Sequence, residues 1–192
     1  IDLLGLDIKQ IMARIDQCDM IYVVGGSCDY LMKILVVSGV MQRFEEFMKD
    51  RLFVGSSAGA MIVGKRPPAD VYGSLYGYGD EDDYGFTNYM NIVPHCLITH
   101  MNETNFDDIS NARLDSISKR YQCRLDGINN SQAIAVGDDG TISYINGDPY
   151  TIGLEYDDSA SGTDAVKGNA TNTGFTHFQG FGGVESIDGA AN

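Results

Sequence analysis

The segment over residues 53–63 combines the residue types of a serine nucleophile with the pattern needed to expose it. An apolar, strand-like run ends at Gly55, Ser57 follows two residues later, and Ala58 and Gly59 open an apolar helical pattern. This G-x-S-x-G arrangement between strand and helix is typical of a nucleophile elbow. The amides at the helix N-terminus can stabilise an oxyanion that develops on a substrate carbonyl. The segment therefore predicts Ser57 as a nucleophile, with a tight turn that serves packing only as the alternative.

A serine hydroxyl needs a base, and histidine is the usual one. The three histidines are His95, His100 and His177. His100 follows a strand pattern over residues 92–99, and the carboxyl ends of strands are where open α/β sheets bind ligands. His95 falls inside that strand pattern, and His177 lies in a polar, glycine-rich tail. We therefore predict His100 as the general base.

The third member of such a site is a carboxylate that orients the imidazole. Two candidates lie between Ser57 and His100: Asp70, which has apolar neighbours, and the acidic run over residues 80–83. A run of four acids is typical of a solvated surface, which favours Asp70 as the orienting acid. Both candidates stay open from the sequence.

The elements that must position these residues alternate between helix and strand. Helical patterns cover residues 7–15, 29–37, 41–48 and 107–121, and strand patterns cover residues 20–24, 52–54 and 92–99. Residues 133–136 and 141–145 flank a glycine-rich turn and predict a hairpin. This alternation predicts an α/β sandwich around a mainly parallel sheet.

The composition changes along the chain. Residues 1–147 predict one α/β domain, whereas residues 148–192 are acidic and rich in Gly, Asn and Thr, which predicts an irregular tail. Residues 65–88 predict a long loop, and loops of this length inside a domain are commonly functional.

The composition also argues against several classes of function. The 192-residue chain carries a formal net charge of −14, whereas nucleic-acid binding requires clustered Lys and Arg. Its apolar runs are too short to span a bilayer. The four cysteines are widely spaced and show no zinc or disulfide pattern. We therefore expect no nucleic-acid or membrane partner, no metal or cofactor, and a cytoplasmic location.

Between about residues 7 and 147 the chain resembles the serine peptidase family that includes dipeptidase E (aspartyl dipeptidase) and cyanophycinase. Residues 19–26 resemble the strand and glycine turn of that family, and residues 54–60 resemble its G-x-S-A-G-A nucleophile block. Residues 92–100 are similar to its strand that ends in the catalytic histidine. The segment that begins at Gln132 is similar to its hairpin near the end of the domain.

This resemblance implies a three-layer α/β/α sandwich like the class I glutamine amidotransferases, which is a flavodoxin-like fold. It implies that Ser57 and His100 act with an acid between them in the chain, in agreement with Asp70. It also implies an oxyanion hole formed by the backbone of Gly26 and Ala58. Members of the family begin with a further strand and helix, so the resemblance predicts that this chain is truncated at its N-terminus.

Three features depart from the family pattern. The glycine turn continues with Ser27 and Cys28, where the family usually has Asn-Thr, and Thr99 replaces the proline before the histidine. Residues 65–88 have no clear match, which leaves the acid and the specificity open.

The main hypothesis is a serine exopeptidase that hydrolyses short peptides, and the resemblance adds a preference for N-terminal aspartate. A cyanophycinase-like enzyme that cleaves β-aspartyl peptides is a second hypothesis. A catalytically inactive binding protein on the same fold is a third, and the departure at Ser27 and Cys28 is the feature that suggests it.

Overall fold

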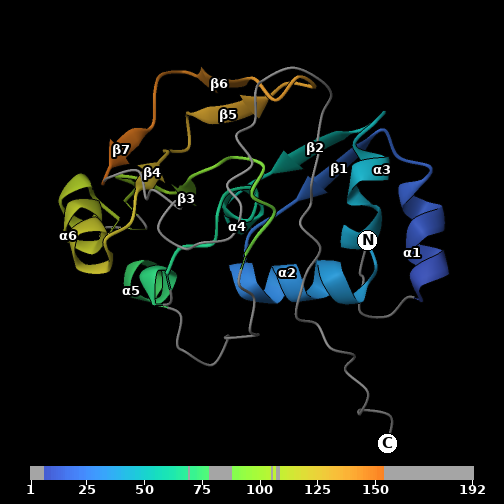
Figure 1. The fold of residues 1–192 in the computed structure, drawn as a ribbon, viewed down its shortest axis with the longest axis horizontal. Coiled ribbons are helices and arrows are strands. Elements are labelled where there is room, and N and C mark those ends of the chain that lie inside the picture. The colour runs from blue at the N-terminus through green and yellow to red at the C-terminus, as the bar shows by residue number, and fades with distance from the viewer. Residues whose placement is uncertain (1–6, 69, 78–87, 105, 107–108, 154–192) are drawn as a thin grey trace, which may run out of the picture.

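The computed structural model describes residues 7–68, 70–77, 88–104, 106 and 109–153 (Figure 1). The helices are α1 (Ile8–Ile15), α2 (Cys28–Val37), the short 3-10 helix η1 (Met41–Arg43), α3 (Phe44–Phe47), α4 (Ala58–Met61), α5 (Val71–Tyr76) and α6 (Asn111–Tyr121). The strands are β1 (Met20–Val23), β2 (Leu52–Gly55), β3 (Cys96–Ile98), β4 (Leu125–Gly127), β5 (Ala133–Val136), β6 (Ile142–Ile145) and β7 (Tyr150–Ile152).

The strands of the described residues form small sheets rather than one large sheet (Figure 1). β1 and β2 are parallel, with Met20 opposite Leu52 and Val23 opposite Gly55. β3 and β4 are also parallel, but β7 joins β4 in the antiparallel direction. β5 and β6 form the predicted antiparallel hairpin. The protein is therefore a mixed α/β structure, and its described strands form small sheets with both parallel and antiparallel pairs.

Side-chain caps determine where the longer helices begin. Asp7 and Gln10 form a reciprocal capping box at the start of α1, with the N–H of Gln10 donating to Asp7 Oδ1 at 2.9 Å. Ser27 caps α2 by accepting a hydrogen bond from the N–H of Tyr30 at 3.3 Å. Ser110 caps α6 in the same way, so this helix begins later than its hydrophobic pattern predicted.

The strand predicted over residues 92–99 is shorter in the structure. Only Cys96–Ile98 forms β3, because Pro94 has no N–H to donate to a neighbouring strand. His95 consequently precedes β3 instead of lying inside it, and its carbonyl oxygen accepts a hydrogen bond from the N–H of Lys65 at 2.9 Å. The helix predicted over residues 41–48 is divided between η1 and α3.

β7 lies beyond the domain boundary that the sequence indicated. The change in composition after Gly147 predicted an irregular segment, whereas residues 150–152 pair with β4. The hydroxyl of Tyr150 also donates to Asp115 Oδ1 on α6 at 2.7 Å. The α/β unit therefore includes β7, and the rest of the predicted tail, residues 154–192, lies outside the described residues.

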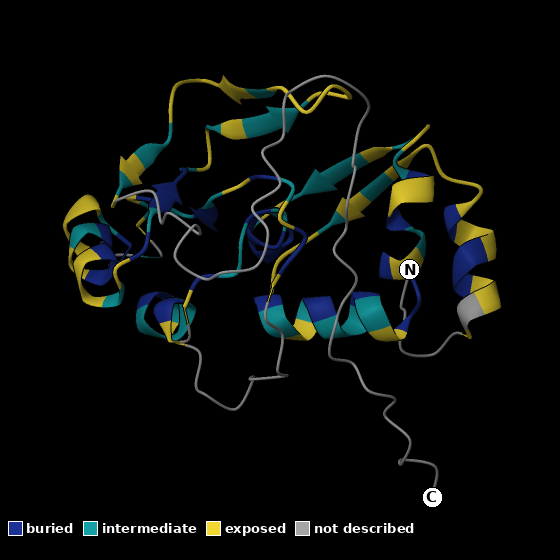
Figure 2. Ribbon diagram, viewed as in Figure 1, coloured by how far each residue is buried: buried dark blue, intermediate teal, exposed yellow. Residues whose placement is uncertain are grey.

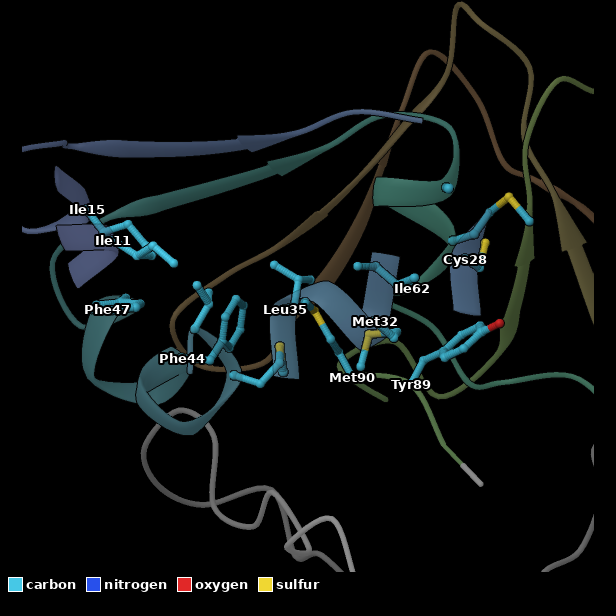
Figure 3. Packing of buried hydrophobic residues seen from close by; sticks show 14 of the residues in the cluster. Ile11, Ile15, Cys28, Met32, Leu35, Phe44, Phe47, Ile62, Tyr89 and Met90 are labelled. Carbon is cyan, nitrogen blue, oxygen red and sulfur yellow. The ribbon is translucent and has the colours of Figure 1, made fainter. Parts of the chain in front are cut away.

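Two hydrophobic clusters hold the helices against the strands (Figure 2). The first packs α1, α2, α3 and α4 together and includes Met32, Phe44 and Phe47 (Figure 3). The second joins α5 and α6 to β3 and β4 around Leu114 and Leu125. Complete burial of a side chain of this size contributes about 1.5–3 kcal/mol to stability. Because α4 also contacts β3, the two clusters meet at the helix that follows Ser57.

Candidate active site

Ser57 lies in the sharp turn between β2 and α4, as the nucleophile-elbow pattern predicts. Its backbone has φ 54° and ψ −124°, a conformation that residues with a side chain rarely adopt. The turn is closely packed: a Cβ on Gly55 would collide with the backbone of Gly59, and one on Gly59 would collide with the carbonyl oxygen of Val23. Two glycines are therefore required for β1, β2 and α4 to approach one another at this point.

His100 contacts the predicted nucleophile directly. Its Nε2 atom is 2.9 Å from Ser57 Oγ, and its side chain is 19% exposed. His100 follows β3 with a φ of 64°. Its ring stacks on Phe106 with ring centroids 4.1 Å apart and an angle of 16° between the planes. This stacking fixes the plane of the imidazole, so Nε2 stays directed at the serine.

Glu103 is the partner of the other ring nitrogen of His100. Its Oε2 atom is 3.3 Å from Nδ1 of His100, on the side of the ring opposite Ser57. An ionised carboxylate only accepts hydrogen bonds, so the proton of a neutral imidazole lies on Nδ1. Nε2 is then free to accept the proton of Ser57. Sequence reasoning missed Glu103, although its position three residues after His100 is a signal that could have drawn attention to it.

The second carboxylate oxygen of Glu103, Oε1, is buried. It has no hydrogen-bond partner among the described residues. The carboxylate is thus held beside the imidazole by one oxygen, in surroundings that exclude most solvent: its side chain is 18% exposed. Reduced solvent screening strengthens the attraction between this carboxylate and an imidazolium.

The structure does not join the sequence-predicted acids to His100. Both ring nitrogens of His100 have partners, Ser57 and Glu103, and neither is Asp70. Asp70 is exposed and precedes α5, a helix inside the predicted loop. Within α5, the hydroxyl of Tyr72 donates to the carbonyl oxygen of Leu97 in β3, and the hydroxyl of Tyr76 donates to that of Thr99 just after β3, whereas Asp70 stands before the helix. The alternative acids, residues 80–83, lie outside the described residues.

The glycine turn after β1 lies close to Ser57. A Cβ on Gly25 would be 3.0 Å from both Cβ and Oγ of Ser57, so only glycine leaves the hydroxyl unobstructed. Gly26 has a φ of 131°, which favours glycine. Two separate elements thus approach Ser57. One is the glycine turn after β1, and the other is the N-terminus of α4, which begins at Ala58.

The departures from the family pattern have structural explanations here. Ser27 is the N-cap of α2, and Cys28 is buried in the first hydrophobic cluster. Burial and the neighbouring Asp29 raise the pKa of Cys28 well above its ordinary value, so the thiol stays neutral and does not compete with the serine. Thr99 donates its N–H to the hydroxyl of Tyr76 at 3.1 Å, a bond that a proline could not make.

The described residues contain no group of three or more His, Cys, Asp or Glu side chains that could hold a metal ion. None of the helices within the described ranges is long and apolar enough to cross a membrane.

Known proteins resemble this chain over most of its described length. An uncharacterized peptidase of Listeria innocua is 28% identical over 146 residues, which cover 74% of this chain and 67% of that protein. An uncharacterized peptidase of Pasteurella multocida is 25% identical over 143 residues, with 74% and 67% coverage. A crystal structure described as a "Putative Peptidase E Protein" from Listeria monocytogenes has 25% identity and a TM-score of 0.55. That likeness covers 81% of this chain and 69% of the other.

These similarities identify the class of the protein as a peptidase. Within that class the chain belongs to peptidase family S51, whose family model matches residues 1–144. The chain spans about two thirds of the length of the relatives it matches, 65–69% in each case.

Proposed function

We propose that this protein is a serine exopeptidase that hydrolyses short peptides through Ser57, His100 and Glu103. The observation that carries the proposal is the unbroken chain of contacts from serine to imidazole to carboxylate, 2.9 Å and 3.3 Å long. A serine hydroxyl at an elbow, a histidine within hydrogen-bond reach and an acid on the far ring nitrogen are the arrangement that nucleophilic catalysis requires.

The proposed reaction proceeds in two halves. Nε2 of His100 takes the proton of Ser57 as Oγ attacks the scissile carbonyl, and Glu103 stabilises the imidazolium that forms. The backbone amides of Gly26 and Ala58 donate hydrogen bonds to the oxyanion. His100 then gives its proton to the departing amine, which leaves an acyl group on Ser57. A water molecule, deprotonated by Nε2, attacks this ester and restores the free serine.

The finer parts of the proposal rest on the resemblance to dipeptidase E. They are the preference for short peptides and for aspartate at the N-terminus, and the three-layer α/β/α arrangement of the complete sheet. The parallel pairs β1–β2 and β3–β4 and the likeness to a peptidase E structure support that arrangement.

A panel of substrates tests the proposed function. We expect turnover of dipeptides such as Asp-Leu, slower turnover of Asn-Leu and Leu-Leu, which lack the acidic side chain, and no cleavage of casein. A fluorophosphonate should label the protein, and Ser57→Ala should remove both the labelling and the turnover. Rapid cleavage of casein without dipeptide turnover would contradict the exopeptidase proposal. Absence of turnover and labelling would favour a binding protein instead.

A further inference from the structure

The hydroxyl of Tyr76, at the end of α5, makes two hydrogen bonds to the backbone of Thr99, the residue directly before His100. It donates to the carbonyl oxygen of Thr99 at 3.0 Å and accepts from the N–H of Thr99 at 3.1 Å. A tyrosine hydroxyl can do both, because it has one proton to donate and lone pairs that accept. Residues that face each other in an antiparallel sheet exchange the same two bonds, so Tyr76 binds Thr99 as a neighbouring strand would.

The backbone is held on both sides of His100. The carbonyl group that Tyr76 binds belongs to the peptide bond between Thr99 and His100, and this bond is planar, so holding its oxygen restricts rotation of the whole plane. After His100, the N–H of Met101 donates to the carbonyl oxygen of Ile128 at 3.1 Å. His100 therefore lies between two residues whose backbones are hydrogen-bonded to other parts of the fold.

The backbone conformation of His100 makes this support important for the site. Its φ of 64° lies in the left-handed region, which residues with a side chain seldom occupy. The backbone angles set the direction of the Cα–Cβ bond, so the imidazole reaches Ser57 from this conformation. Loss of a hydrogen bond beside His100 would let the backbone relax towards a more common φ and turn Nε2 away from Oγ of Ser57.

Tyr76 also supports the imidazole through its aromatic ring. Its ring meets the ring of Phe106 edge to face, with the centroids 6.4 Å apart and an angle of 79° between the planes. Aromatic pairs favour this arrangement. Phe106 in turn stacks on the imidazole of His100. Tyr76 therefore acts on both the backbone and the ring plane of the same histidine.

Thr99 is connected to the helix that follows the nucleophile as well. Its side chain is buried, and its Oγ1 atom donates to Sδ of Met61 in α4 at 3.3 Å. A thioether sulfur is a weak acceptor, so this bond contributes more to geometry than to stability. Thr99 thus links α5, which carries Tyr76, to α4, which begins directly after Ser57.

We propose that Tyr76 is a positioning residue that keeps Nε2 of His100 within reach of Oγ of Ser57. It does so through the backbone of Thr99 and through the ring of Phe106. This inference rests on the proposed function. A misplacement of about 1 Å can lower the rate of an enzyme by about 10²-fold, so removal of this one hydroxyl should lower kcat by about 10-fold.

The experiment makes the same substitution at two positions of α5. Tyr76→Phe removes the hydroxyl beside His100 and keeps the ring. Tyr72→Phe is the matched control, because the hydroxyl of Tyr72 also donates to a backbone carbonyl oxygen, that of Leu97, at 3.1 Å, but two residues further from His100. Phe106→Leu keeps both hydroxyls and removes the ring between Tyr76 and the imidazole.

Four measurements separate positioning from a purely structural role. They are kcat and KM for a dipeptide, the rate constant of labelling by a fluorophosphonate, the melting temperature, and the hydrogen exchange of the Met101 amide. Tyr76→Phe should lower kcat and the labelling rate by the same factor, because both reactions need the base beside Ser57, while KM stays close to wild type. Phe106→Leu should lower both rates too.

Tyr72→Phe should keep both rates close to wild type, even where it lowers the melting temperature as much as Tyr76→Phe does. Exchange of the Met101 amide should become faster in Tyr76→Phe, because the segment around His100 is less restricted, and should stay unchanged in Tyr72→Phe. This measurement needs no catalytic activity.

Several outcomes would overturn the inference. One is wild-type kcat and labelling in folded Tyr76→Phe, and another is unchanged exchange of the Met101 amide in that variant. An equal loss of kcat in Tyr72→Phe would assign the effect to the packing of α5 as a whole, and wild-type kcat in Phe106→Leu would remove the role of the ring. If Ser57→Ala is inactive while Tyr76→Phe is fully active, the inference fails and the proposed function stands. If Ser57→Ala keeps its turnover, the proposed function itself fails.

Discussion

Ser57→Ala is expected to remove nearly all peptide hydrolysis, a loss of about 10⁴–10⁶-fold in kcat, without unfolding the protein. The hydroxyl of Ser57 lies within hydrogen-bond distance of Nε2 of His100, at 2.9 Å. Ser56→Ala is the matched control, because Ser56 is the exposed neighbour in the same turn and should be close to wild type. The test is to measure the rate of dipeptide hydrolysis by each variant and to check by circular dichroism that each variant is folded. Wild-type turnover in folded Ser57→Ala would disprove the mechanism.

Glu103→Gln is expected to lower kcat by about 10³–10⁴-fold while the fold is kept. The amide of glutamine can donate to Nδ1 of His100, which favours the tautomer with the proton on Nε2. That tautomer cannot accept the proton of Ser57. The measurement is kcat for hydrolysis of the same dipeptide over a range of pH.

Asp70→Asn is the control for this prediction and should be close to wild type, because Asp70 is exposed and is not a partner of either ring nitrogen of His100. If Asp70→Asn lowers kcat strongly and Glu103→Gln leaves kcat nearly unchanged, the orienting acid is Asp70, as the sequence favoured. In that case the contact between Glu103 and His100 would have no catalytic role.

The sequence was most informative where the determining contacts are local. The elbow around Ser57 depends on neighbours within two residues, and the cap at Asp7 depends on Gln10 three positions away, so a pattern along the chain can find them. His100 could be chosen because it follows a strand pattern. The hairpin of β5 and β6 was predicted for the same local reason: a glycine-rich turn between two short apolar runs.

The acid could not be chosen in this way, because its position depends on the backbone path after β3. His100 and Asn102 both have positive φ values, 64° and 55°, and this unusual path returns Glu103 to the imidazole. Positive φ values are uncommon for residues with a side chain, and a pattern of residue types along the chain does not reveal them. β7 was missed for a related reason: its pairing with β4 is distant in sequence, while its neighbours have the composition of a loop.

The backbone conformation of Ser57 affects the thermal stability of the protein. At φ 54° and ψ −124° a residue with a Cβ is strained by roughly 1–3 kcal/mol, whereas glycine adopts these angles readily. Ser57→Gly should therefore be inactive and still melt at a higher temperature than Ser57→Ala, which calorimetry can measure; a lower melting temperature would contradict this. Selection for reactivity and selection for heat resistance thus act in opposite directions on this one residue.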